Sequence, residues 1–594
     1  MVISKIVRRR CNKIATSAQV PLSVALSGLL SVSCAAEVSN PRPGGAAVGS
    51  PGPNSSSGGN TSNPVAVPSG SVGGPVGSVP ANLGTCAPGA AIAPLRRITA
   101  GQYAASVQDL FRGKIAPSVQ FPSSTTTISP SGFSTDPESN AVTQLAAEGI
   151  LKAAEDTAVD VGTKLTELLP CAATAPDQAC AGQFLDDYGT RAFRRALTAD
   201  ERSNLLAVFS GFSADGFNVG IAAMTEAMLQ LPQFLYLIEM GTADAPTGAI
   251  QLTPDEVATR LSFLLWGSLP DDALRTAARS GGLSSPMGVR SEALRLLSDA
   301  RANGAVQRFF REWTSFKHLA ASSRTALDPT FSDALDASMQ AQFDQFASDS
   351  VFGADPSLEH LFTSNSVPVD AELAKFYGVA APSGAGFSAV SLDATHAAGL
   401  LGLPALLGGL SHETVTSIVF RGKFGLTKLL CTDLPSPPAG AASQSPVLPA
   451  DATTRQKSEA LRANPTCAAC HNLIDNVGLG FEDFDAVGRY RTVDALGRPV
   501  DARGQLPNGK VFNGVAELGT LLATDPVVGQ CLAKQWFRFT FSRRESDADS
   551  CTLSALEGAL ALPGRSLKEL MLAVVSQPAF SARLVRDTAT GGAP

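Results

Sequence analysis

Two cysteines and a histidine form the most reactive cluster of the sequence, in the run Cys467-Ala468-Ala469-Cys470-His471. A Cys-x-x-Cys-His run is typical of covalent haem attachment. Each thiol can add to one vinyl group at the porphyrin edge, and the imidazole that follows can bind the iron as an axial ligand. The two cysteines also suit a redox disulfide or half of a zinc site. We expect haem c, bound covalently through Cys467 and Cys470, with His471 as the proximal ligand.

The sequence offers two candidates for the second axial ligand. Met571 follows the motif, in the apolar stripe of a predicted helix, where methionine more often fills the core. His412 precedes the motif and lies close to a conspicuous pair of glycines. We therefore expect His412, Met571 or an open iron position, and the open position would permit ligand or peroxide chemistry.

Three arginines near the motif are candidates for binding the haem propionates, namely Arg421, Arg489 and Arg491. A guanidinium fork matches a carboxylate in both geometry and charge. The alternative is an ion pair within the protein, with Glu482, Asp483 or Asp485. Both readings stay open at the level of the sequence.

The N-terminus carries the pattern of an export signal. Basic residues precede an uncharged apolar run over 21–32, which is too short to span a bilayer. The residues that lead to Cys34 resemble a bacterial lipoprotein cleavage box, so we predict a lipoprotein signal peptide over 1–34 with lipid on Cys34. Ordinary cleavage after Ala35 or Ala36 is the alternative. The expected location is the periplasm or the cell surface, with the lipid in the outer membrane.

A run without charged residues follows, from 43 to 95, in which Gly, Ser, Pro and Asn dominate. Such a composition cannot bury enough apolar surface to offset its ordering entropy. We predict a disordered linker over 35–94 that holds the folded part of the chain away from a membrane surface.

The remaining cysteines fit disulfide formation in an oxidising compartment. With Cys34 assigned to lipid and the motif to haem, an even set is left in the mature chain: Cys86, Cys171, Cys180, Cys431, Cys531 and Cys551. Proximity along the chain predicts Cys171–Cys180 and Cys531–Cys551, which leaves Cys86–Cys431. The even number does not separate haem from a Cys467–Cys470 disulfide, because both use two cysteines.

Helical spacing of apolar residues dominates the rest of the chain. The clearest helix covers 253–266, where Thr253 and Glu256 form a capping box and Gly267 follows the last turn. Pairs at 99 and 102 and at 198 and 201 repeat this start signal. Further helices are predicted over 141–168, 183–196, 215–238, 288–316, 332–352 and 526–541. The only strand signal that we accept is a small hairpin around Asn508-Gly509. We predict a mainly α fold.

Several segments, in a fixed order, resemble a known group of proteins. They are RRITAGQYAASVQDLF, RAFRRALTADE, LTPDEVATRLSFLLWGSLPDDAL, AELAKFYGV, HETVTSIVFRGKFGLTKLLC and NPTCAACHNLIDNVGLGFEDFDAVGRYR. The chain resembles exported bacterial multi-domain proteins of unknown function with a C-terminal cytochrome-c-like haem-motif domain. In this chain Asn476 replaces the proline that usually follows the motif aspartate, Asp475.

This resemblance and the helix pattern together predict three folded parts. They are an N-terminal helical domain over 95–250, a central helical domain over 251–395 and a cytochrome-c-like haem domain over 396–585. The resemblance implies no substrate.

We expect an exported, lipid-anchored c-type haem protein that acts in electron transfer and docks a redox partner protein or an extracellular substrate. One alternative is a haem-dependent oxidase or peroxidase with an open iron site, and another is a non-enzymatic surface scaffold with a Cys467–Cys470 disulfide. Whether the chain is an enzyme stays open. Its net charge of −7 and its lack of a basic patch with interleaved aromatic residues argue against a nucleic-acid partner.

Overall fold

The structure is a computed structural model that describes residues 94–119, 121, 129–242, 249–319, 321–435, 449, 451–561, 564 and 566–584. The predicted signal peptide 1–34 with Cys34, the predicted linker 35–94 apart from its last residue, and Cys86 lie outside these described residues. By their contacts, the described residues belong to one compact unit.

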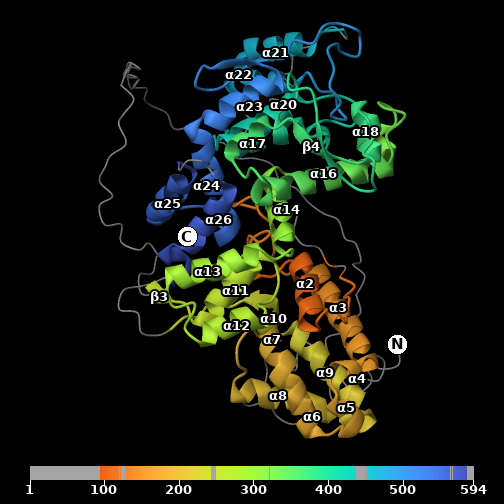
Figure 1. Cartoon of the computed structure of the whole chain (residues 1–594), viewed down its shortest axis with the longest axis vertical. Coiled ribbons are helices and arrows are strands. Elements are labelled where there is room, and N and C mark those ends of the chain that lie inside the picture. Colours follow the sequence, from red (N-terminus) through yellow and green to blue (C-terminus); the bar gives the residue numbers. More distant parts are fainter. Residues whose placement is uncertain are drawn as a thin grey trace, which may run out of the picture. The chain divides into compact units, whose positions relative to one another are not determined.

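Helices make up most of the described chain, which confirms the mainly α prediction (Figure 1). The N-terminal part contains α2 (Ala100–Leu110), α3 (Gln144–Thr163), α4 (Leu165–Leu168), α5 (Cys171–Thr174), α6 (Gln178–Phe184), the π-helical turn η1 (Leu185–Gly189), α7 (Thr190–Ala192), α8 (Ala199–Phe212), η2 (Ser213–Asp215), α9 (Phe217–Gln230) and α10 (Pro232–Leu235). The central part contains α11 (Pro254–Leu265), α12 (Asp272–Arg279), α13 (Pro286–Leu297), α14 (Ala302–Trp313), α15 (Ala321–Arg324), α16 (Asp333–Phe352), α17 (Leu358–Thr363) and α18 (Ala371–Tyr377).

The C-terminal part continues the helical pattern. It contains η3 (Gly399–Gly402), α19 (Pro404–Gly409), α20 (Ile418–Phe424), the π-helical turn η4 (Gly425–Leu429), α21 (Thr454–Ala463), α22 (Pro465–Gly478), η6 (Leu479–Phe481), α23 (Gly514–Thr524), α24 (Pro526–Phe541), η7 (Asp547–Asp549), α25 (Ser550–Ala561), α26 (Leu567–Val575) and η8 (Pro578–Phe580). Among the described residues, no helix is both long enough and apolar enough to span a membrane.

The described strands form antiparallel pairs only. They are β1 (Arg96–Arg97) with β2 (Tyr236–Leu237), β3 (Ala249–Gln251) with β8 (Ala582–Leu584), β4 (Ser366–Val369) with β5 (Ser388–Ser391), and β6 (Arg503–Gln505) with β7 (Val511–Asn513). The last pair is the hairpin predicted around Asn508-Gly509. The pair of β3 and β8 joins the start of the central part to the end of the described chain.

Capping boxes begin three helices at the predicted positions. The Thr253 side chain accepts a hydrogen bond from the backbone N–H of Glu256, whose carboxylate accepts one from the N–H of Thr253 at 2.8 Å. The same reciprocal pattern begins α2 at Thr99 and α8 at Thr198. Each box satisfies N–H groups that the first helical turn leaves without partners, so these helix starts depend on local sequence alone.

The predicted helix over 288–316 is two helices, α13 and α14. Between them the Asp299 side chain accepts a hydrogen bond from the backbone N–H of Arg301 at 2.9 Å. Such a local contact competes with the helical hydrogen bond, and the chain turns at this point. The Arg301 guanidinium then stacks over the Trp266 ring at 3.5 Å, so the break places a cation on a core aromatic residue.

Two hydrophobic cores hold the described helices together. The first is built from residues between 98 and 269, and the second mainly from residues between 252 and 580. The second core therefore runs without interruption through the residues predicted as the central and the C-terminal domains. The domain boundaries at 250 and 395 stay predictions.

Disulfides confirm one of the predicted pairs and correct the others. Cys171 is bonded to Cys180 as predicted. The pairs Cys531–Cys551 and Cys86–Cys431 are wrong, because Cys431 is bonded to Cys531, while Cys551 is disulfide-bonded to another partner. Cys531 lies on α24, which packs against η4, and Cys431 follows η4 closely. The number of residues between two cysteines does not show which helix faces they occupy. The contact between those faces decided the pairing.

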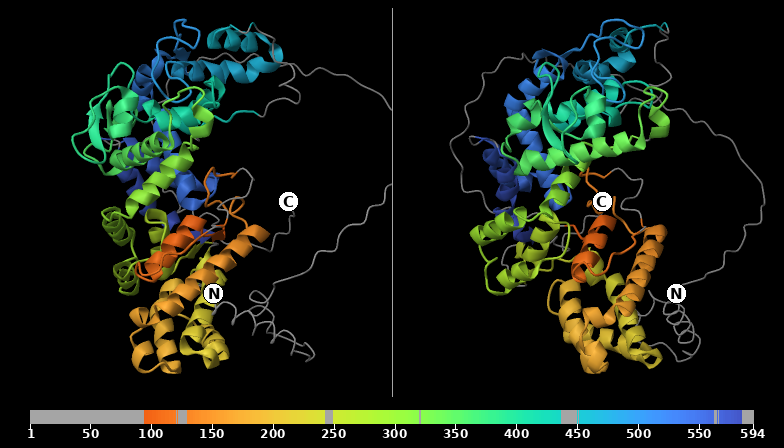
Figure 2. Two further views of the ribbon diagram at one scale, coloured as in Figure 1. Left: turned by 90° about the vertical axis from the view of Figure 1, so that its right-hand side faces the viewer. Right: turned by 45° about the vertical axis from the view of Figure 1, so that its right-hand side comes forward.

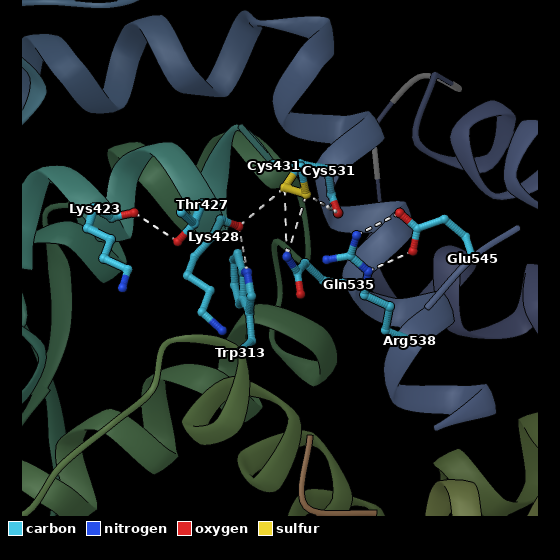
Figure 3. The surroundings of a disulfide bond; sticks show 9 residues. All are labelled: Trp313, Lys423, Thr427, Lys428, Cys431, Cys531, Gln535, Arg538 and Glu545. Carbon is cyan, nitrogen blue, oxygen red and sulfur yellow. Dashed lines mark hydrogen bonds and ion pairs between the residues drawn. A yellow bond between two sulfur atoms is a disulfide. The ribbon is translucent and has the colours of Figure 1, made fainter. Parts of the chain in front are cut away.

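The Cys431–Cys531 bond links distant parts of the chain (Figure 3). Gln535 Nε2 lies 3.5 Å from the Cys431 sulfur, and Trp313 Nε1 donates to the backbone O of Lys428 at 2.8 Å beside it. The bond spans 100 residues of sequence. For a loop of that length the loss of unfolded-state entropy corresponds to about 4.7 kcal/mol of stability. The bond therefore fixes the end of η4 against α24.

Candidate haem-attachment site

The Cys-x-x-Cys-His run lies in the first two turns of α22. Asn464 begins this helix, because its side-chain O accepts a hydrogen bond from the backbone N–H of Thr466 at 2.9 Å, and Pro465 occupies the first helical position. Helices α21 and α22, labelled in Figure 1 and seen from other sides in Figure 2, pack against each other. The motif is therefore presented by a regular helix that a second helix supports.

Both motif cysteines carry free thiols in the structure. Cys467 is 7% exposed, whereas Cys470 is partly exposed and packs against the second hydrophobic core. Residues three apart on a helix share one face. Both thiols thus point to the same side of α22, which is the arrangement that two additions to one porphyrin edge require.

The His471 imidazole is oriented by a buried carboxylate. Its Nδ1 lies 2.9 Å from Asp475 Oδ1, one helical turn further on. The other oxygen of Asp475 accepts a hydrogen bond from the hydroxyl of Ser458, on α21, at 2.7 Å. An ionised carboxylate only accepts hydrogen bonds, so Nδ1 carries a proton, and in the neutral imidazole Nε2 then carries the lone pair. Nε2 has no hydrogen-bond partner among the described residues.

Asp475 is completely buried. Burial raises the pKa of its carboxyl group, while the hydrogen bonds from Ser458 and His471 act in the opposite direction. Both hydrogen bonds compensate the buried carboxylate for its lost hydration, so the loss of either one would be unfavourable. A carboxylate that holds the second nitrogen of a histidine is a common arrangement around metal-bound imidazoles, where it fixes the ring and raises its basicity.

Two glycines bring α20 into direct backbone contact with α22. A Cβ atom at Gly478 would lie 1.9 Å from the backbone O of Ile418, and one at Gly422 would lie 2.0 Å from that of Ile474. Because the later residue of α20 meets the earlier residue of α22, the two helices run antiparallel. Their approach leaves no room for a side chain at either glycine.

The two predicted distal ligands lie in different places, His412 at the surface before α20 and Met571 in the core on α26. His412 is exposed, its ring lies 4.9 Å from that of Phe420, and it precedes the end of α20 that contacts Gly478. His471 lies two turns earlier on α22, about 10 Å along the helix axis. Met571 is 3% exposed in the core, on α26, which packs mainly against α13, α16, α24 and α25, and Figure 1 shows α26 well away from α22.

The three candidate propionate-binding arginines contact protein groups. Arg421 is completely buried and donates to the backbone O atoms of Phe481, Phe484 and Asp485. Burial lowers the pKa of Arg421 to about 10, against the charge of Glu482 at 3.7 Å. A propionate would have to displace these carbonyl groups to reach it.

Arg491 and Arg489 are less enclosed than Arg421. Arg491 contacts both the backbone O and the carboxylate of Glu482, at 3.0 and 3.2 Å. Arg489 donates to Asp328 and to the backbone O of Phe376, at 2.7 Å each. The ion-pair alternative thus describes the contacts of Arg421 and Arg491 with Glu482. Arg489 instead pairs with Asp328, which is far away in the sequence. A haem contact of these side chains stays a prediction.

Sequence reasoning missed the roles of Asp475 and Ser458. The signal for the first was present, since a histidine and an aspartate four residues apart on a helix are neighbours. Nothing in the sequence pointed to Ser458, because its contact depends on how α21 packs. Within the described ranges, no group of three or more His, Cys, Asp and Glu side chains is placed to hold a metal ion.

Comparisons with known proteins match five consecutive segments to families of unknown function. They are DUF1587 over residues 96–161, DUF1595 over 180–239, DUF1592 over 252–379, DUF1588 over 397–494 and DUF1585 over 508–580. This chain is a multi-domain protein of unknown function. The Cys-x-x-Cys-His run lies within the segment similar to DUF1588. No curated protein and no solved structure matches the chain.

The helix crossing at Gly478 yields a stability prediction. Gly478→Ala should destabilise the protein by about 1–3 kcal/mol or more, because the added methyl group overlaps a backbone carbonyl that cannot rotate away. Denaturant unfolding of purified protein measures the effect. Gly529→Ala is the matched control, since its Cβ would meet nothing nearer than 3.9 Å on α24. That control should be neutral or slightly stabilising. Equal stability of both variants would contradict the crossing.

Proposed function

We propose that this chain is an exported c-type haem protein that acts in electron transfer. Cys467 and Cys470 would each add their S–H across one vinyl group to form thioethers, and His471 Nε2 would bind the iron. The bound haem would supply a one-electron carrier. The observation that carries the proposal is the Asp475 hydrogen bond, which holds the His471 ring and leaves Nε2 available.

The cellular setting belongs to the same proposal. The N-terminal pattern favours export as a lipoprotein, with Cys34 lipidated and the body of the protein in the periplasm or at the cell surface. Haem c would then be attached outside the cytoplasm. A redox partner protein or an extracellular substrate would dock on the helical parts that precede residue 396.

Haem attachment is tested by producing the full chain together with haem-maturation machinery. We expect a Soret band, a haem-stained band that survives denaturation and a mass increase of one haem. The double variant Cys467→Ser with Cys470→Ser should lose all of these, because no thioether can form. A wild-type protein without haem, in cells that mature a known c-type cytochrome, would contradict the proposal.

Asp475→Asn tests the positioning role of the carboxylate in the haem-loaded protein. The amide is a weaker acceptor than the carboxylate, so His471 becomes a poorer donor to ferric iron. We expect the reduction potential to rise by tens of millivolts while haem stays attached, as potentiometric titration would show. Glu459→Gln removes an equal charge from the exposed side of α21 and should leave the potential nearly unchanged. Identical shifts in the two variants would indicate a general charge effect instead.

A haem-dependent oxidase or peroxidase is the second candidate, and the positions of the two predicted distal ligands favour it. Met571 is buried in the core, far from α22. His412 precedes the end of α20 that contacts Gly478, and this glycine lies two helical turns after His471 on α22. An open sixth position should bind CO in the ferrous state and cyanide in the ferric state, with shifts of the Soret band. If neither ligand changes the spectrum, the iron has two protein ligands and electron transfer is the remaining haem function.

A further inference from the structure

Arg308, on α14, has no hydrogen-bond partner among the described residues, and its Nε is buried. Its guanidinium lies over the Phe539 ring, 4.9 Å from the centroid. Burial lowers the pKa of Arg308, with only the charge of Glu312 opposing this. A guanidinium has five N–H donors. The side chain is only partly buried, so its two Nη groups face solvent without a protein acceptor. This side chain therefore has N–H groups that are free to bind a ligand.

A second arginine converges on the same place. Arg96, on β1, donates to the hydroxyl of Ser542 at 2.9 Å and to the backbone O of Thr540 at 3.3 Å, and both acceptors are neutral. Burial lowers the pKa of Arg96 to about 10; Glu239 opposes the shift, and the nearby charges of Arg260 and Arg308 add to it. Two guanidinium groups therefore lie near each other, and neither is hydrogen-bonded to a carboxylate.

The neighbouring carboxylates are already occupied. Glu239 forms a two-pronged pair with Arg260, at 2.8 and 2.6 Å. Both oxygens of Glu312 accept hydrogen bonds from Ser134, one from its backbone N–H and one from its hydroxyl, at 2.9 and 2.6 Å. Their charges reduce the local positive potential, but they satisfy no N–H group of Arg308.

The end of α24 offers a simpler explanation for part of this arrangement. A helix C-terminus carries a partial negative charge of about half an electron, which favours nearby cations. Arg96 uses it, since it bonds to Thr540 in the last turn and to Ser542 just beyond it. Arg308 does not, because it faces the Phe539 ring rather than a carbonyl group. The helix end thus accounts for Arg96 and leaves Arg308 unexplained.

We propose that Arg96 and Arg308 bind an oxyanion, namely the carboxylate or phosphate group of a small ligand. Guanidinium forks match both groups, and such charge-assisted hydrogen bonds are about twice as strong as neutral ones. The site joins the segments similar to DUF1587, DUF1592 and DUF1585, through β1, α14 and α24. Binding would therefore stabilise the contact of three parts of the chain, independently of haem.

Thermal unfolding of the full chain tests the site, with inorganic phosphate and succinate as probes at constant ionic strength. Constant ionic strength is needed because surface charge effects vary with salt. We expect the Tm to rise in a saturable manner with at least one probe. Phosphate alone would assign a phosphate ligand, and succinate alone would assign a carboxylate ligand. Arg308→Gln should weaken the apparent affinity by about tenfold or more, as expected when a charged hydrogen bond is lost.

Arg503→Gln is the matched control, because Arg503 is an exposed arginine paired only with Asp501. It should respond to both probes as the wild type does. Arg308→Gln should fold without the probes, since it removes no hydrogen bond, and circular dichroism checks this. A wild-type Tm that is indifferent to both probes, or equal responses of wild type and Arg308→Gln, would overturn the proposal.

Discussion

The candidate site depends on the hydrogen bonds of one buried carboxylate, which connect two helices. Asp475 is completely buried and binds Ser458 on α21 and His471 on α22. A carboxylate in the interior is tolerated only while hydrogen bonds replace its hydration. The packing of α21 on α22 and the orientation of the imidazole are therefore coupled, because a shift of either helix would break one of the two bonds.

The surroundings of α22 add rigidity at the level of the backbone. Gly422 and Gly478 let α20 approach α22 closely at the level of the backbone, and Arg421 joins α20 to carbonyl groups at the end of η6 and just after it. The Cys431–Cys531 bond then ties the end of η4 to α24. The motif helix α22 thus packs on a part of the second core that a disulfide bond stabilises. Such packing suits an imidazole that must keep a fixed orientation.

The two arginine environments show how differently the fold treats buried cations. Arg421 is enclosed but donates to several carbonyl oxygens, so its charge is compensated by the protein itself. Arg308 is less enclosed and yet has no hydrogen-bond partner among the described residues. The free-energy cost of burying a charge depends on such compensation rather than on depth alone. This contrast separates a structural arginine from one with capacity to bind a ligand.

The sequence by itself determined the helical class, the capping boxes at Thr99, Thr198 and Thr253, the short hairpin and the Cys171–Cys180 bond. All of these depend on residues close together in the chain, whose interactions form wherever the segment folds. It also pointed to the motif at Cys467. Only the tertiary structure decided the partner of Cys431, the break before α14 and the contacts of Arg421. These depend on which helix faces meet, and long-range packing, rather than spacing along the chain, sets that.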